Sequence, residues 1–196
     1  MIYFASPKHK NIKNIDNYLK VIKKVILSGD YILGKNVKSF EKKLKNYFNC
    51  RYVITNNSGT DSLIMSLMCL NLKKNDEVLV PSHTASATLT SLKLMQYNYR
   101  FVDIDYKTMN LDLEDMKKKI NKNTKAIIAV HLYGHPCEIE KIKSICTRKK
   151  IFLIEDCAQA FGANYKGKKV GTFGDFGCFS FFPTKNLSAI GDAGAV

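Results

Sequence analysis

Apolar segments of strand length alternate with helical segments along most of this chain. The runs that have the length and the β-branched or aromatic content of strands are 51–55, 77–81, 101–105, 126–130, 151–156 and 177–182. Segments with apolar residues at helical spacing lie between them, at 60–70, 87–96, 113–120 and 139–149. This alternation predicts βαβ units, and therefore an α/β fold with a mostly parallel sheet and helices on both of its faces.

Two helical patterns precede the first of these strands. Apolar residues recur at helical spacing over 15–26 and 37–47, and Gly29 follows the first pattern as a stop signal. The sequence therefore predicts two parts, a helical N-terminal segment over 1–50 and a sheet-containing large domain over 51–196.

The net charge of the chain raises the question of a nucleic-acid partner. The 196 residues carry a formal net charge of +14 at pH 7. The arginines, however, are only Arg51, Arg100 and Arg148, although arginine is the usual residue for bidentate contacts to bases and phosphates. The lysines are spread along the chain and do not form one block. We therefore expect no nucleic-acid partner.

The sequence also bears on the compartment. Its apolar runs are too short to cross a bilayer. The start, MIYFASPKHK, lacks the hydrophobic region of an export signal. The six cysteines form no C-x-x-C pair. These features predict a reduced, cytoplasmic protein that does not bind a membrane.

Ligands of parallel sheets bind beyond the carboxyl ends of the strands, so the residues that follow each strand are candidate site residues. Ser58, Gly59 and Thr60 follow the first strand and open a helix, where free N–H groups and the helix dipole favour an anion. The same residues are also common as a plain helix N-cap. Taken alone, this segment leaves the two interpretations equally open.

Two later strands are followed by residues with acid, amide, hydroxyl and amine groups. Asp156 and Gln159 follow 151–156, and Ser180 and Lys185 lie at the end of 177–182 and in the loop after it. An acid at a strand end could cap the next segment, and most lysines in so basic a chain are simply solvated. Together, however, these groups match what pyridoxal phosphate requires from a protein: a lysine for covalent chemistry, a carboxylate for the pyridinium nitrogen and hydroxyls for the phosphate.

At these residues the sequence resembles the DegT/DnrJ/StrS family of pyridoxal-phosphate sugar aminotransferases, which have the aspartate-aminotransferase fold (fold type I). The resemblance runs nearly from end to end. Its combined order of motifs is specific, and the motifs are SGDYILGKNVKSFE, SGTDSL, NDEVLVPSHTASAT, FVDID, AVHLYGHP, IEDCAQAFGANYKGKKVGTFGD and CFSFFPTKNLSAIGDAGAV. The resemblance implies a three-layer large domain, and we expect the chain to be interrupted at Val196 before a small C-terminal domain.

The resemblance implies a role for each cofactor-binding residue. Asp156 matches the partner of the pyridine nitrogen, and Gln159 matches a glutamine that contacts the ring. Gly59 and Thr60 match the phosphate-binding turn, and Ser180 matches a phosphate-binding serine.

Lys185 matches the lysine that forms the internal aldimine and later moves the proton between cofactor and substrate. A related dehydrase branch of the family has histidine at this position, so the lysine indicates transamination. The implied reaction moves an amino group from L-glutamate to a nucleotide-linked keto sugar, in the biosynthesis of a cell-surface polysaccharide or a natural product. The resemblance also implies a homodimer, and we expect residues 1–196 alone to be weakly active or inactive.

Two positions depart from the family pattern. Ala85 stands where the family often has an aromatic residue that stacks on the cofactor, and Ala189 replaces a common glycine after the lysine. Other interpretations are a truncated, inactive fold-type-I protein or binding module, and another fold-type-I enzyme such as a cysteine desulfurase or decarboxylase.

Two further motifs do not indicate a site. GTFGDFG (171–177) is glycine-rich, but its spacing is neither G-x-G-x-x-G nor G-x-x-x-x-G-K-[ST], and it leads into a strand. His131, His135 and Cys137 cluster in sequence, but they lie in a strand end and turn, so we expect no metal there.

Overall fold

The structure, a computed structural model, describes residues 6–196 apart from the side chains of residues 9 and 10. The chain divides into two compact units, 1–55 and 56–196. The predicted division at residue 50 into a helical segment and a large domain stays a prediction. The prediction that the chain starts without an export signal falls partly on residues 1–5, outside the described residues.

The first unit consists of helices. They are α1 (Pro7–Asn11), a short 3-10 turn (Ile12–Asn14), α2 (Ile15–Ser28) and α3 (Lys35–Phe48). Helix α2 ends at Gly29, whose φ of 68° is the left-handed conformation that glycine adopts without strain. Helix α3 buries Leu44 and Phe48, whereas α2 buries no residue.

The second unit (56–196) is built on one sheet, whose strands from edge to edge are β9, β8, β5, β4, β2 and β3, with Asn56 of β1 (Thr55–Asn56) beside β9. Strand β8 is parallel to β5, β5 to β4, β4 to β2 and β2 to β3, while β9 runs antiparallel to β8. The strand bounds are β2 Glu77–Pro81, β3 Asn98–Val102, β4 Thr124–Val130, β5 Phe152–Asp156, β8 Phe176–Ser180 and β9 Gly194–Ala195. A separate hairpin joins β6 (Asn164–Tyr165) to β7 (Lys168–Lys169).

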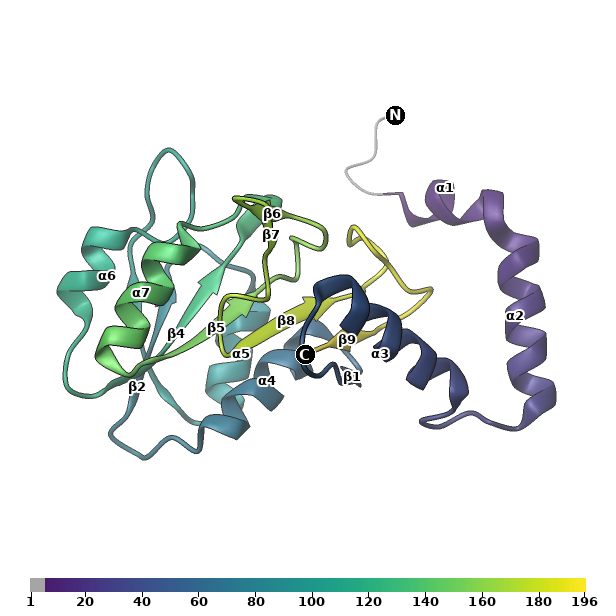
Figure 1. Cartoon of the computed structure of the whole chain (residues 1–196), viewed down its shortest axis with the longest axis horizontal. Coiled ribbons are helices and arrows are strands. Elements are labelled where there is room, and N and C mark those ends of the chain that lie inside the picture. Colours follow the sequence, from purple (N-terminus) through teal and green to yellow (C-terminus); the bar gives the residue numbers. More distant parts are fainter. Residues whose placement is uncertain (1–5) are drawn as a thin grey trace. The chain divides into compact units, whose positions relative to one another are not determined.

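Helices cover both faces of this sheet (Figure 1). They are α4 (Gly59–Leu70), α5 (Ser86–Leu94), α6 (Leu113–Lys119) and α7 (Ile139–Lys149), with a 3-10 turn at Leu132–Gly134. Successive side chains of a strand point to opposite faces, so Leu79 packs with α6 and α7 while its neighbours Val78 and Val80 pack with α4 and α5. Each fully buried aliphatic side chain stabilises the fold by about 1.5–3 kcal/mol. The predicted α/β class with a mostly parallel, two-sided sheet is confirmed.

Two predicted strands have different bounds in the structure. The strand predicted over 51–55 is reduced to Thr55–Asn56, and the Thr55 N–H and hydroxyl both donate to Glu41 Oε1 at 2.9 Å. The strand predicted over 101–105 instead runs from Asn98 to Val102, because the Asp103 N–H leaves the ladder and donates to Asp115 Oδ2 at 2.6 Å. In the second case a side-chain carboxylate takes the N–H with which the strand would otherwise continue.

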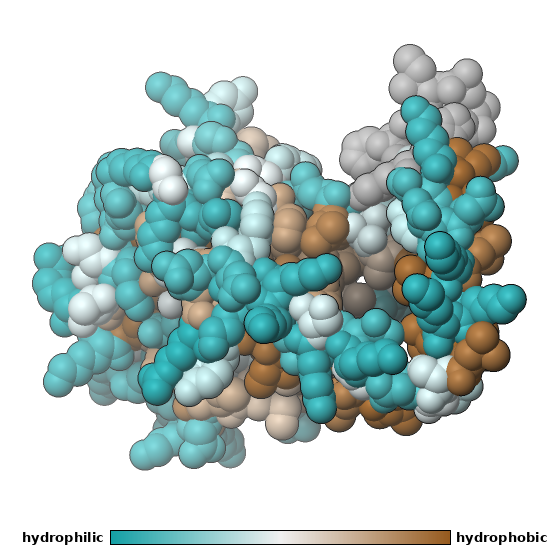
Figure 2. All heavy atoms as spheres, turned by 45° about the vertical axis from the view of Figure 1, so that its right-hand side comes forward, coloured by the Kyte–Doolittle hydropathy of each residue, from teal (hydrophilic) through white to brown (hydrophobic). Residues whose placement is uncertain are grey.

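Apolar side chains are exposed along one face of α2. Ile15, Leu19, Ile22 and Ile26 are all more than two-fifths exposed. Figure 2 shows apolar side chains along this helix, on the right of the view, next to hydrophilic ones. Despite this stripe, no helix in the described part of the chain combines the length and apolar character that crossing a membrane requires.

Candidate functional site

A cavity of about 550 Å³ opens at the carboxyl ends of β4, β5 and β8. Its position follows from the parallel topology, because the loops after parallel strands meet at one edge of the sheet. The sequence-predicted site residues all line it, and they are Gly59, Thr60, Asp156, Gln159, Ser180 and Lys185. Lys185 and Asp156 therefore face one space, although Asp156 ends β5 and Lys185 lies in the loop after β8.

The N-terminus of α4 forms one wall of this cavity. Ser58 caps the helix, and its Oγ accepts a hydrogen bond from the Asp61 N–H at 3.1 Å. The N–H groups of Gly59 and Thr60 belong to the first turn, where a helix has no internal acceptors to offer. This end of α4 is therefore suited to an anion, as the helix dipole also favours.

Gly59 and Ser180 approach each other closely across the cavity wall. A Cβ atom built at Gly59 would lie 2.7 Å from Ser180 Cβ, which is far inside van der Waals contact. The absence of a side chain at position 59 thus lets the N-terminus of α4 lie close enough to the end of β8 for both to contact one anion.

We predict that Gly59→Ala weakens the binding of pyridoxal phosphate, the expected ligand, by roughly tenfold. The added methyl pushes Ser180 away from the helix end, and overpacking of this kind costs about 1–3 kcal/mol. Titration of the protein with the cofactor measures the change. Gly191→Ala is the matched control, because a Cβ there meets nothing within 4 Å. Equal affinities of the two variants would contradict this account of the turn.

Asp156 is the last residue of β5, in the middle of the sheet between β4 and β8. Its side chain is 5% exposed, with one hydrogen-bond donor on each oxygen: the Ala158 N–H on Oδ1 at 3.1 Å and the Thr88 hydroxyl on Oδ2 at 3.0 Å. Burial raises the pKa of the Asp156 carboxyl, and these two hydrogen bonds and the charge of Lys185 oppose that rise. A cationic ligand group would stabilise the ionised form.

Gln159 is oriented by the backbone of the loop after β4. Its Oε1 accepts a hydrogen bond from the Tyr133 N–H at 2.8 Å. Because a backbone N–H needs an acceptor, the oxygen of the amide must face Tyr133, and the NH₂ group is the part left to face the cavity. Gln159 is thus set to donate to a ligand. Tyr133 holds this position with a φ of 56°, a left-handed conformation rare for a tyrosine.

Lys185 lies in the loop between β8 and β9 and is half-buried at the cavity. Its own N–H donates to the Phe182 carbonyl at 2.8 Å, which forms a tight turn after the strand. The loop is closed behind it, because the Ala189 N–H donates to the Phe181 carbonyl at 2.7 Å and the Phe181 N–H donates to the Ala193 carbonyl at 2.7 Å. Ala189, which departs from the family pattern, is therefore part of this closure.

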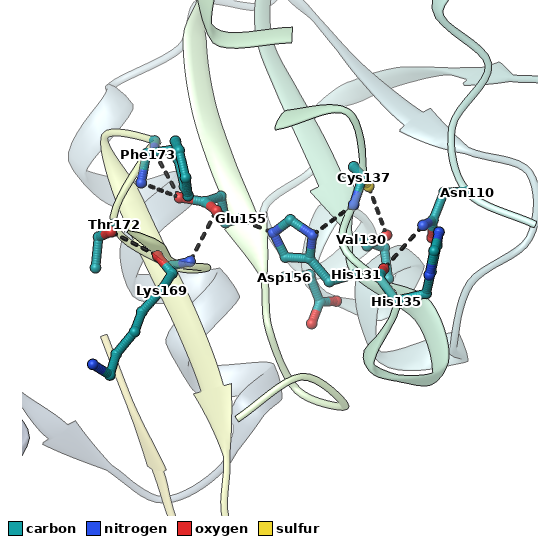
Figure 3. Close-up of polar contacts among 12 residues, drawn as sticks. Asn110, Val130, His131, His135, Cys137, Glu155, Asp156, Lys169, Thr172 and Phe173 are labelled. Atoms are coloured by element: carbon teal, nitrogen blue, oxygen red, sulfur yellow. Dashed lines mark hydrogen bonds and ion pairs between the residues drawn. The ribbon is translucent and has the colours of Figure 1, made fainter. Parts of the chain in front are cut away.

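A buried polar network lies beside the cavity, on the other face of β5 (Figure 3). Glu155 is fully buried, and its two oxygens accept four hydrogen bonds at 2.6–3.0 Å, from the N–H groups of Gly171, Phe173 and Gly174 and from His131. Figure 3 shows that Glu155 and its neighbour Asp156 point in different directions, as strand alternation requires.

The same network answers the question of a metal. His131, Glu155 and Cys157 have ligand atoms within 4.8 Å of one another. His131 Nδ1, however, accepts the Cys137 N–H at 3.0 Å, so Nε2 must carry the proton that it donates to Glu155 Oε2 at 3.0 Å. Both ring nitrogens are thus engaged, and neither has a lone pair for a cation. His135, named with His131 in the sequence cluster, lies outside this group.

Sequence reasoning missed Thr88 and Glu155. Thr88 is buried in α5 and is 68 residues from its partner Asp156, so no local pattern reveals the contact. A signal was nevertheless present, since Thr84 and Thr88 lie one helical turn apart just after a strand end. Glu155 could have been noticed as a charged residue inside an otherwise apolar strand, IFLIED.

The comparisons with known proteins agree with this geometry. A sequence model described as the DegT/DnrJ/EryC1/StrS aminotransferase family matches residues 13–196. The chain is 42% identical over 163 residues to GDP-perosamine synthase of Escherichia coli O157:H7, covering 83% of this chain and 44% of that protein. It is 38% identical over 196 residues to UDP-2-acetamido-2-deoxy-3-oxo-D-glucuronate aminotransferase of Pseudomonas aeruginosa PAO1, covering 100% of this chain and 55% of that protein.

Solved structures show the same fold. The crystal structure of NtdA from Bacillus subtilis, with bound cofactor PMP, superposes with a TM-score of 0.88 at 33% identity, covering 93% of this chain and 41% of that one. The chain spans about half the length of the curated relatives it matches. From the match over residues 13–196, the chain belongs to the DegT/DnrJ/EryC1/StrS aminotransferase family.

Proposed function

We propose that this chain is part of a pyridoxal-phosphate-dependent aminotransferase that moves an amino group from L-glutamate to a nucleotide-linked keto sugar. The observation that carries the proposal is the convergence of Gly59, Thr60, Asp156, Gln159, Ser180 and Lys185 on one cavity. The family and the nucleotide-linked sugars in the names of two relatives support it. We further propose a role in cell-surface polysaccharide or natural-product sugar biosynthesis.

The cavity fits the cofactor in size and in chemistry. Its volume of about 550 Å³ lies in the ordinary range for small-molecule sites. The buried Asp156 has one hydrogen-bond donor on each oxygen. Burial raises its pKa and so disfavours the ionised form, which a protonated pyridine nitrogen would stabilise. The N-terminus of α4 and the Ser180 hydroxyl would hold the phosphate.

Each residue then contributes a definable step. When bound, the cofactor supplies a ring that accepts the electron pair of the breaking substrate bond. Asp156 would keep a proton on the ring nitrogen, and Gln159 would donate a hydrogen bond from its amide. Lys185 would provide the amine that binds the cofactor covalently and would move the proton between the carbon atoms of cofactor and substrate. Ala85, which stands where the resemblance implies an aromatic residue stacked on the cofactor, also lines the cavity.

We propose that the whole protein is a homodimer. The apolar stripe of α2 supports this, because an exposed face of that size usually marks an interaction surface. We also propose a cytoplasmic location, which the six free cysteines support.

Residues 1–196 alone are predicted to bind the cofactor but to turn over weakly or not at all. Half of the length of the relatives lies outside this chain, and residues that hold the sugar are expected there. The measurement compares amino transfer from glutamate to a nucleotide-linked keto sugar by this chain and by a version extended to the length of the relatives, with light scattering to report the dimer. Strong transamination by residues 1–196 would overturn the prediction.

The alternatives give different results in the same experiment. An inactive binding module would form no borohydride-trappable adduct with the cofactor. A different fold-type-I enzyme would form the adduct but would consume cysteine or decarboxylate an amino acid instead of aminating the sugar ketone.

A further inference from the structure

We propose that Thr88 is a positioning residue that fixes the charge and the direction of the Asp156 carboxylate. The inference rests on the proposed function, since it assigns Thr88 to the support of the group that faces the cofactor nitrogen. Thr88 lies in α5 and is fully buried. Its hydroxyl donates to Asp156 Oδ2 at 3.0 Å, and its Oγ1 lies 2.8 Å from Thr84 Oγ1.

The chemistry of an ionised carboxylate gives this chain of hydroxyls a direction. A carboxylate can only accept, so the single hydroxyl hydrogen of Thr88 must point to Asp156. Thr84 must then donate to Thr88, because Thr88 has no second hydrogen to give. The resulting order, Thr84 to Thr88 to Asp156, aligns two hydroxyl dipoles with the negative charge, and aligned hydrogen bonds strengthen one another.

A buried threonine in a helix usually has a more ordinary role. Its hydroxyl commonly donates to a backbone carbonyl one turn earlier. The contacts of the Thr88 hydroxyl are instead two side chains, and one of them is an acid 68 residues away. The contact thus joins α5 to the end of β5. It stabilises the Asp156 carboxylate and does not contribute a hydrogen bond to the helix backbone.

Thr88 acts through Asp156 and not on the ligand. Thr84, Ala85 and Ser86 line the cavity, whereas Thr88 lies behind them and does not. Asp156 Oδ2 receives the hydrogen bond from Thr88 and Oδ1 receives the one from the Ala158 backbone. Since only a proline at position 158 would remove that backbone donor, Thr88 is the support of Asp156 that other substitutions can vary.

The other ionisable groups near Asp156 do not replace this support. His131 lies just after β4 and its charge opposes the rise in the Asp156 pKa, but its Nε2–H donates to Glu155 and not to Asp156. Lys185 also lines the cavity. In the proposed function its amine is bonded to the cofactor and is not available to pair with Asp156. Burial disfavours the ionised acid, so the loss of the Thr88 hydroxyl should shift Asp156 toward its neutral form.

The test uses two matched pairs at position 88 that separate the hydroxyl from side-chain size. Wild type and Thr88→Val have nearly the same shape, and Thr88→Ser and Thr88→Ala differ only by the hydroxyl. Each protein is loaded with pyridoxal phosphate labelled with ¹⁵N in the ring, and the ¹⁵N chemical shift is followed against pH. Thermal unfolding of each variant checks that it folds, and the smaller Ser and Ala pair carries the comparison if Thr88→Val does not.

The proposal makes the hydroxyl the deciding feature. One neutral-to-charged hydrogen bond contributes about 1.5 kcal/mol, or about one pH unit. The ring nitrogen should therefore lose its proton about one unit lower in Thr88→Val and Thr88→Ala, and cofactor affinity should fall roughly tenfold. Thr88→Ser should follow the wild type.

Three outcomes would overturn the proposal. Unchanged ¹⁵N titrations in both variants without a hydroxyl would show that Thr88 only fills space. A serine variant as impaired as alanine would show that packing, and not the hydrogen bond, matters. If the wild type itself gave no cofactor-bound ¹⁵N signal, the proposed function would fail first, and this inference with it.

Discussion

Replacing Lys185 with alanine is expected to abolish the reducible, yellow adduct between the protein and pyridoxal phosphate. In the proposed function Lys185 supplies both the amine that binds the cofactor aldehyde and the group that moves the proton. Without it, the ring can still be held by Asp156 and the phosphate by the α4 N-terminus, so the cofactor should bind without a covalent link. Absorbance spectra before and after borohydride treatment, followed by mass spectrometry of the protein, measure the loss.

Lys166→Ala provides the control for this experiment. Lys166 is an exposed lysine paired with Glu140 at 2.6 Å, away from the cavity, and such pairs contribute at most about 1 kcal/mol. That variant should keep the adduct and the spectrum of the wild type. If a full-length Lys185→Ala protein still aminated the sugar ketone, or if borohydride fixed the cofactor to another lysine in the wild type, the assignment of the catalytic residue would be wrong.

Glu155→Gln is expected to lower the free energy of unfolding by about 3–5 kcal/mol, the usual loss when one partner of a buried charged contact is removed. Each carboxylate oxygen of Glu155 accepts two hydrogen bonds. An amide nitrogen cannot accept, so glutamine in either orientation leaves two buried N–H donors facing an NH₂ group. Urea unfolding followed by circular dichroism measures the difference.

Glu114→Gln is the matched control for this variant. Glu114 forms an ion pair with Lys117 on the surface of α6, and its side chain is 71% exposed. The same change there should alter stability by less than about 0.5 kcal/mol. If both variants unfolded at the same urea concentration, Glu155 would not be the anchor that its contacts indicate.

Glu155 also explains a motif that the sequence left without a role. GTFGDFG has the small residues of an anion-binding loop, but its spacing fits no phosphate loop. In the structure the N–H groups of Gly171, Phe173 and Gly174 do bind an anion, which is the carboxylate of Glu155 from the same chain. The turn is thus fixed to β5, the strand that carries Asp156.

The parts of the fold that the sequence predicts well are those set by local patterns. Strand 77–81 and helix 139–149 have the predicted bounds, because each is a periodic segment with clear ends. The strand predicted over 101–105 ends at Val102 because Asp115, in α6, takes the Asp103 N–H. A tertiary hydrogen bond of this kind has no signature in the strand itself.

The candidate site shows the same division. Residues that follow strand ends could be named from the sequence, because parallel topology brings those ends together. The supports of the site could not. Thr88 contacts Asp156 across 68 residues, and Tyr133 orients Gln159 across 26, and both contacts exist only after the sheet has formed.

The burial of Asp156 has a consequence for the stability of the protein as well as for its chemistry. Because burial raises the pKa of this acid, its ionised form at neutral pH makes the folded chain less stable than an ordinary aspartate would. A vitamin-derived cation that settles beside it removes that penalty, and binding to the native state alone adds further stability. In the proposed function, the folded chain is therefore more resistant to unfolding with the cofactor bound than without it.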